Sequence, residues 1–142
     1  MTEPNDFNSR IISEFRTNGG KVGGMFANAT LLLLHSTGAR TGAERVSPLG
    51  YQAVDGGYAI FASKAGAPDH PAWYHNLLAH PRATVEIGTD VVEVTARVAG
   101  PGEREPIWSR QKETQPQFAG YERKAGNRQI PVVILEPVRP LS

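Results

Sequence analysis

The chain has 142 residues, of which 39% are hydrophobic and 20% are charged, and its formal net charge is +1. This length suits one domain with a real core, and the near-neutral charge provides no overall field of the kind that attracts nucleic acid. The absence of cysteine excludes disulfides, thiolate metal sites, iron–sulfur clusters and a cysteine nucleophile. The N-terminus is polar and acidic, and the longest aliphatic run has four leucines, so we expect a cytoplasmic protein.

Apolar periodicity predicts a helix over residues 6–17, because Phe7, Ile11 and Phe15 recur every four residues and form one stripe. A glycine-rich lead-in follows, to about residue 28. The leucine run does not alternate with polar residues, which is typical of a strand buried on both faces. Strands are predicted at 30–36, 45–54, 58–63, 83–88, 91–99 and 129–136, and further helices at 71–79, 103–113 and 116–122.

The order of these elements favours an antiparallel sheet, because the strand–helix–strand rhythm of parallel sheets is missing. The first three strands are typical of an antiparallel meander. We therefore predict a single α+β, mainly β, domain over residues 1–142, in which an antiparallel barrel has helices packed outside it. Pro48 requires a bulge or a sheet edge, and Pro106 is expected in the first turn of its helix.

The loop over residues 36–48 has the composition of an anion-binding segment. Gly38 and Gly42 allow sharp turns, while Arg40 and Arg45 can form bidentate pairs with phosphate or carboxylate. From residue 21 to residue 64, four basic residues face two acidic ones, so this region is locally positive. The alternative interpretation is a solvated hairpin turn. The segment matches neither the Walker loop nor the dinucleotide fingerprint.

Three further segments follow this loop: Phe-Ala-Ser-Lys-Ala-Gly at 61–66, Pro-Ala-Trp-Tyr-His-Asn-Leu at 71–77 and Ile-Pro-Val-Val at 130–133. Together with Thr-Gly-Ala-Arg-Thr-Gly at 37–42, they resemble the deazaflavin (F-420)-dependent nitroreductase family over about residues 24–137. Each segment alone is a weak signal, but the set in this order and spacing is specific.

The resemblance implies a split antiparallel β-barrel of the flavin-reductase or FMN-binding type. It also implies the cofactor coenzyme F-420, an 8-hydroxy-5-deazaflavin with a phosphate and a polyglutamate tail, and no metal. By this resemblance, the phosphate and tail would be held by Arg40, Thr41, Gly42 and Arg45. The ring and ribityl side would be lined by Ser47, Pro48, Ala62, Ser63 and Lys64, and the cleft would be flanked by Trp73, Tyr74 and Asn76.

The implied activity is hydride transfer from reduced F-420 to a quinone-like or nitro-aromatic acceptor, because deazaflavin is a hydride carrier. Tyr121 is the candidate for hydrogen-bonding or protonating the acceptor, and Phe118 shares its helical face, so both are expected to contact substrate. Phe118 stands where the family pattern suggests tyrosine. That departure bears on nitro reduction more than on cofactor binding.

Two other interpretations stay open: an FMN-dependent split-barrel oxidoreductase, and a deazaflavin-binding carrier or sensor without turnover. The basic loop counts mildly against FMN, since one phosphate needs fewer cations than a polyglutamate tail. A homodimer and peripheral contact of the first helix with the inner face of the cell membrane also stay open. His70, His75 and His80 are five residues apart, so they cannot converge from one helical face, and no metal site is expected.

Overall fold

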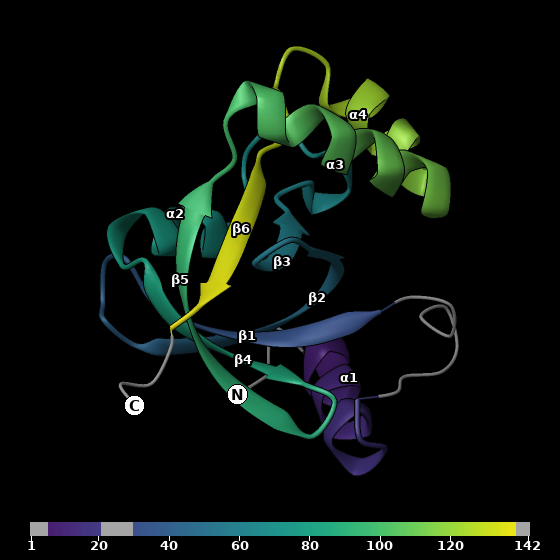
Figure 1. Cartoon of the computed structure of the whole chain (residues 1–142). Helices are drawn as coiled ribbons and strands as arrows, with labels where there is room; N and C mark the ends of the chain where they lie inside the picture. Colours follow the sequence, from purple (N-terminus) through teal and green to yellow (C-terminus); the bar gives the residue numbers. More distant parts are fainter. Residues whose placement is uncertain (1–5, 21–29, 139–142) are drawn as a thin grey trace.

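Antiparallel strands close into a barrel in the order β1-β2-β3-β6-β5-β4 (Figure 1). The computed structural model describes residues 6–20 and 30–138. The strands are β1 (Leu31–Thr37), β2 (Glu44–Val54), β3 (Gly57–Phe61), β4 (Arg82–Ile87), β5 (Asp90–Val98) and β6 (Val132–Pro137). The helices are α1 (Asp6–Thr17), α2 (Ala72–Ala79), α3 (Pro101–Thr114) and α4 (Gln117–Ala125), with a short 3-10 helix, η2 (Lys64–Gly66). The predicted fold class and meander are confirmed.

β1 is buried on both faces, as its leucine run predicts. Leu32 and Leu34 point into the barrel, whereas Leu31 and Leu33 pack against α1. All four side chains are at most 7% exposed. Burying a leucine stabilises a fold by roughly 1.5–3 kcal/mol, so β1 is the central packing element of the sheet.

The apolar stripe of α1 is used by the core. Ile11 and Phe15 are buried against the outer leucines of β1, and Figure 1 shows α1 lying beside β1 and β4. The side chain of Phe7 and the glycine-rich lead-in lie outside the described residues. No helix in the described ranges combines the length and apolar character needed to cross a bilayer.

Pro48 lies where β2 has a strand partner on one side only. β2 pairs with β1 from Glu44 to Gly50, but its pairing with β3 begins at Tyr51. Proline, which has no N–H, is tolerated at such a local edge, so the expectation of an edge position is confirmed. The consequence for function is that the first half of β2 is free to line a cleft.

A second cluster of buried side chains joins α3 and α4 to the outside of the barrel, with Trp108 as its largest member. The two helices lie together beyond one end of β3 and β6 (Figure 1). The expectation for Pro106 is wrong. α3 begins at Pro101, which occupies the favoured first turn itself, so Pro106 lies inside the helix.

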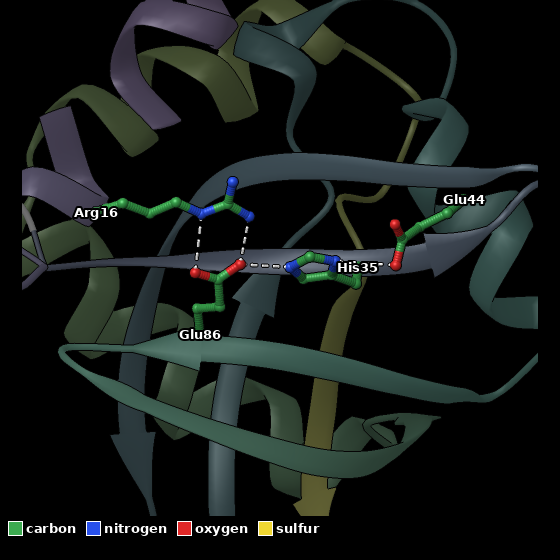
Figure 2. A network of polar contacts seen from close by, with 4 residues as sticks. All are labelled: Arg16, His35, Glu44 and Glu86. Atoms are coloured by element: carbon green, nitrogen blue, oxygen red, sulfur yellow. Dashed lines mark hydrogen bonds and ion pairs between the residues drawn. The ribbon is translucent and has the colours of Figure 1, made fainter. Parts of the chain in front are cut away.

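A row of four polar side chains links α1 to the barrel (Figure 2). The Arg16 guanidinium donates to both Glu86 carboxylate oxygens, at 3.1 and 2.6 Å. His35 Nε2 lies 2.5 Å from Glu86, and its Nδ1 lies 3.0 Å from Glu44. The hydrogen bond from Arg16, together with the one from His35, outweighs burial and lowers the pKa of Glu86 from 4.5 to about 2.

Glu86→Gln should lower the free energy of unfolding by about 1–3 kcal/mol at neutral pH, because it removes a charge-assisted hydrogen-bonding centre. The folded-state pKa is depressed, so this contribution is complete above pH 4.5 and is lost as the pH falls through about 2. Urea unfolding of the wild type and of Glu86→Gln, from neutral pH down to about pH 2, measures the difference in their free energies of unfolding.

Glu93→Gln is the matched control, since its ion pair with Arg82 joins side chains that are 60% and 63% exposed. Such a pair contributes about 0–1 kcal/mol. The stabilising role of Glu86 would be contradicted if Glu86→Gln lost no more free energy of unfolding than Glu93→Gln, or if its loss did not become smaller in acid.

Candidate functional site

A cleft of about 680 Å³ lies between the β1–β2 loop, the first half of β2 and α2. Its volume falls within the range typical of ligand sites. It is lined by Gly38, Ala39, Arg40, Thr41, Glu44, Arg45, Val46, Ser47, Ala72, Trp73, His75 and Asn76. The segment that the sequence singled out as anion-binding therefore forms one wall of the cleft.

The loop holds its shape through its own hydrogen bonds. The Gly38 amide donates to the Ala43 carbonyl at 2.7 Å, and the Gly42 amide donates to the Gly38 carbonyl at 2.9 Å. Gly42 has φ +74°, a conformation that other residues rarely adopt, and it is not among the lining residues. Gly42 thus turns the chain at this point, and the direct cofactor contact that the resemblance implies for it stays a prediction.

Asn76 ties this loop to α2. Its side-chain oxygen accepts a hydrogen bond from the Ala39 amide at 2.9 Å, and the residue is 8% exposed. Trp73 and Leu77, on the same helix, are buried in the barrel core. Because α2 is anchored in this way, the two walls of the cleft are fixed relative to each other.

The cleft presents unpaired positive charge. Arg40 and Arg45 are exposed, and neither forms an ion pair within ranges 6–20 and 30–138. Thr41 Oγ accepts from the Ala43 amide at 3.2 Å, so its hydroxyl proton remains available to a ligand. Glu44 is the carboxylate of the lining, and it contacts His35.

Ser36 adds an unused donor next to this wall. It is 2% exposed, and its hydroxyl oxygen has no partner in the described part of the chain. It is the register partner of Arg45 across β1 and β2. Paired residues point to the same side of a sheet, so this hydroxyl lies on the Arg45 side. Unsatisfied buried polar groups are rare in proteins, and Ser36 itself is not among the residues that line the cleft.

The predicted cofactor residues fall into two groups. Those that line the cleft are Arg40, Thr41, Arg45, Ser47, Trp73 and Asn76. Those that do not line it are Gly42, Pro48, Ala62, Ser63, Lys64 and Tyr74. Three of the second group, Ala62, Ser63 and Lys64, lie where β3 ends and η2 begins.

Arg128 organises this second region. Its guanidinium donates to the carbonyls of Ala62 at 3.0 Å, Ser63 at 2.7 Å and Ala67 at 2.9 Å. It also lies 2.8 Å from Nδ1 of His70. No local pattern in the sequence indicates this role, because the partners are 58 to 66 residues away. Arg128 thus fixes the backbone that the resemblance places beside the cofactor ring.

His70 connects the Arg128 contacts to the cleft. Arginine can only donate, so Nδ1 of His70 must accept, which requires the neutral ring. Burial, followed by the charge of Arg128, lowers the pKa of His70 in agreement with this. The His70 ring lies 4.8 Å from Tyr74 and 6.0 Å from His75, which lines the cleft.

Lys64 is held in an uncommon conformation, with φ 48°, and its ammonium lies 3.5 Å from Asp69. Positive φ in a residue other than glycine indicates local strain that often marks a functional segment. The cation is thus partly engaged at the surface. Within the described chain, His, Cys, Asp and Glu side chains nowhere gather in a group of three suited to a metal ion.

Phe118 and Tyr121 lie on α4, away from the cleft lining. Their rings are 5.1 Å apart, and Phe118 also packs on Phe61 and Trp108. Tyr121 is half-buried. Its helix, α4, packs closely against η2, because a Cβ added to Gly66 of η2 would lie only 2.8 Å from the Tyr121 carbonyl oxygen. Phe118 therefore has a packing role, and Tyr121 lies beside the backbone that Arg128 fixes.

Comparison with known proteins places this chain in a family. The family described as "F420H(2)-dependent quinone reductase" matches residues 9–137. A protein of that description from Mycobacterium tuberculosis is 35% identical over 125 residues, which span 85% of this chain and 83% of the relative.

Solved structures agree with this placement. One described as an F420-H2 dependent reductase is 41% identical, with a TM-score of 0.68, over 75% of this chain and 93% of its own. Another, described as a domain-swapped dimer, is 37% identical, with a TM-score of 0.70, over 94% and 100%. A pyridoxamine-phosphate-oxidase-like protein from Listeria innocua, 11% identical with a TM-score of 0.56, shares the fold. This chain therefore belongs to the F420H(2)-dependent quinone reductase family.

Proposed function

We propose that this protein transfers a hydride from reduced F-420 to a quinone, and that the cleft beside the β1–β2 loop holds the anionic part of the cofactor. Family membership supports the cofactor and the type of reaction. The observation that carries the assignment of the site is the pair of unpaired guanidinium groups on one wall of the cleft.

The residues present fit the chemistry of this cofactor. A phosphate and several carboxylates require cations and donors, which Arg40, Arg45 and the Thr41 hydroxyl can provide. FMN, with one phosphate, would use less of this positive charge, so the family and the cleft both favour F-420.

Reduced F-420 supplies a hydride, and a quinone that accepts it together with one proton becomes a quinol. The protein's own contribution is to position donor and acceptor and to stabilise developing charge. We assign binding of the phosphate and tail to Arg40 and Arg45. We assign the ring side to the backbone at Ala62 and Ser63, which Arg128 holds in place.

Tyr121→Phe should lower kcat about tenfold with little change in cofactor affinity, because one hydrogen bond to the acceptor is lost. The Tyr121 hydroxyl has no hydrogen-bonding partner in the portion of the chain that the structure covers, so it is free for this role. Steady-state kinetics of the wild type and the variant measure kcat, and a cofactor titration measures their affinity for F-420. Equal turnover would make Tyr121 a packing residue.

We propose quinones, rather than nitro-aromatics, as the main acceptors. The reason is that Phe118, where the resemblance suggests tyrosine, is committed to packing on Phe61 and Trp108. We also propose that the chain forms homodimers, with the solved relative described as a dimer as support. Sedimentation of the purified protein, and parallel assays with a quinone and a nitro-aromatic compound, test these two points.

The site itself is tested by titrating oxidised F-420 into the purified protein and following the cofactor's fluorescence. We expect saturable binding that weakens with salt, because the contacts are charged, and little displacement of bound F-420 by an equal concentration of FMN. Binding of FMN in preference to F-420 would contradict the proposed function.

A further inference from the structure

The wall of the cleft that carries Arg40 and Arg45 also carries the carboxylate of Glu44. An unpaired carboxylate there would repel a ligand with a phosphate and several carboxylates. We propose that His35 neutralises Glu44, so that the cleft keeps its full positive charge for the polyanionic cofactor. His35 is then a positioning residue that sets cofactor affinity without touching the cofactor, and this inference rests on the proposed cofactor site.

The geometry requires His35 to donate from both ring nitrogens. Nε2 lies 2.5 Å from a Glu86 oxygen and Nδ1 lies 3.0 Å from a Glu44 oxygen, and ionised carboxylates can only accept (Figure 2). A histidine bonded to two carboxylates in this way is the imidazolium ion. The pair of His35 and Glu44 therefore adds no net charge to the wall of the cleft.

Glu86 keeps this arrangement in place. Its carboxylate is held by two hydrogen bonds from Arg16 on α1, and its pKa is lowered to about 2, so it stays ionised. The charged groups that face His35 are thus Glu44 from β2, Glu86 from β4 and, across Glu86, Arg16 from α1. Arg16 balances Glu86, which leaves the charge of His35 to balance Glu44.

Loss of one proton from His35 would expose Glu44. A neutral imidazole has one N–H, and the shorter contact is the one to Glu86, whose side chain is 18% exposed, against 69% for Glu44. The remaining proton therefore stays on Nε2, and a lone pair on Nδ1 then faces the Glu44 carboxylate. The Glu44 carboxylate then has no hydrogen bond from His35, and its negative charge offsets one of the two positive charges of Arg40 and Arg45.

The decisive experiment is a double-mutant cycle on the affinity for oxidised F-420, measured by fluorescence titration at low salt and slightly acid pH. His35→Asn should weaken binding by roughly 2- to 5-fold, the range of a solvent-exposed ion pair. Glu44→Gln should bind as tightly as the wild type or more tightly. The double variant His35→Asn, Glu44→Gln should regain the affinity of Glu44→Gln.

Each other outcome has a definite meaning. If the loss persists in the double variant, His35 supports the fold of the loop and the inference is wrong. Unchanged binding by His35→Asn, with normal binding by the wild type, would overturn the inference and leave the proposed function intact. Absence of F-420 binding by the wild type would overturn both.

Discussion

Trp108→Ala is expected to lower the free energy of unfolding by about 3–5 kcal/mol, the usual cost of removing a buried large aromatic side chain. Trp108 is 1% exposed and packs on Phe61 and Phe118 at ring distances of 5.9 and 6.0 Å. Its removal would leave a cavity between the barrel and the two helices α3 and α4.

Polar contacts around the indole add to this loss. The indole N–H donates to Glu122 at 2.6 Å, and the Arg104 guanidinium lies 5.3 Å from the ring centroid. Burial opposes ionisation of Glu122, but hydrogen bonds from Trp108 and Lys112 outweigh it and lower its pKa. Removing Trp108 therefore also weakens the contact that joins α3 to α4.

Urea unfolding of three variants measures the effect and separates its causes. Trp108→Phe keeps most of the apolar volume and loses the N–H, so it should cost about 1–3 kcal/mol. Ser109→Ala, at an exposed neighbouring position on the same helix, is the control and should stay within about 0.5 kcal/mol of the wild type. A Trp108→Ala loss below that of Trp108→Phe would contradict the packing described for this cluster.

Arg45→Ala should weaken the binding of F-420 by about 1.5–3 kcal/mol, the range of a charge-assisted hydrogen bond, or roughly 10- to 150-fold. Arg45 lines the cleft and has no ion-pair partner in residues 6–20 and 30–138, so its guanidinium is available to the cofactor. Its removal halves the unpaired positive charge of this wall.

Fluorescence titration against salt measures this effect. The slope of affinity against salt concentration should be shallower for Arg45→Ala, because fewer charges take part. Arg110→Ala removes another exposed guanidinium, from α3 and outside the cleft, and should leave affinity unchanged. If the two variants bind alike, Arg45 is not part of the site.

Much of the fold could be predicted because its signals are local. The four-residue recurrence of Ile11 and Phe15 placed α1, and the unbroken leucine run placed a strand buried on both faces. The loop around Arg40 and Arg45 was recognisable because glycines, hydroxyls and arginines follow one another in the sequence.

The contacts that complete the site were not predictable, because they join residues far apart in the chain. His35 and Glu86 are 51 residues apart, and Arg128 reaches Ser63 across 65 residues. No spacing rule connects such positions before strand order is known. The resemblance places Lys64 on the ring and ribityl side of the cofactor, and no local pattern announces the contact of its ammonium with Asp69.

The most direct test of the account is an anaerobic assay of reduced F-420 with the purified protein, with and without the soluble quinone menadione. We expect the absorption band of oxidised deazaflavin to return with the quinone faster than in a protein-free control, and Arg45→Ala to require more cofactor for the same rate. A protein that binds F-420 but never speeds its oxidation by menadione or another quinone would contradict quinone reduction and indicate a carrier or sensor.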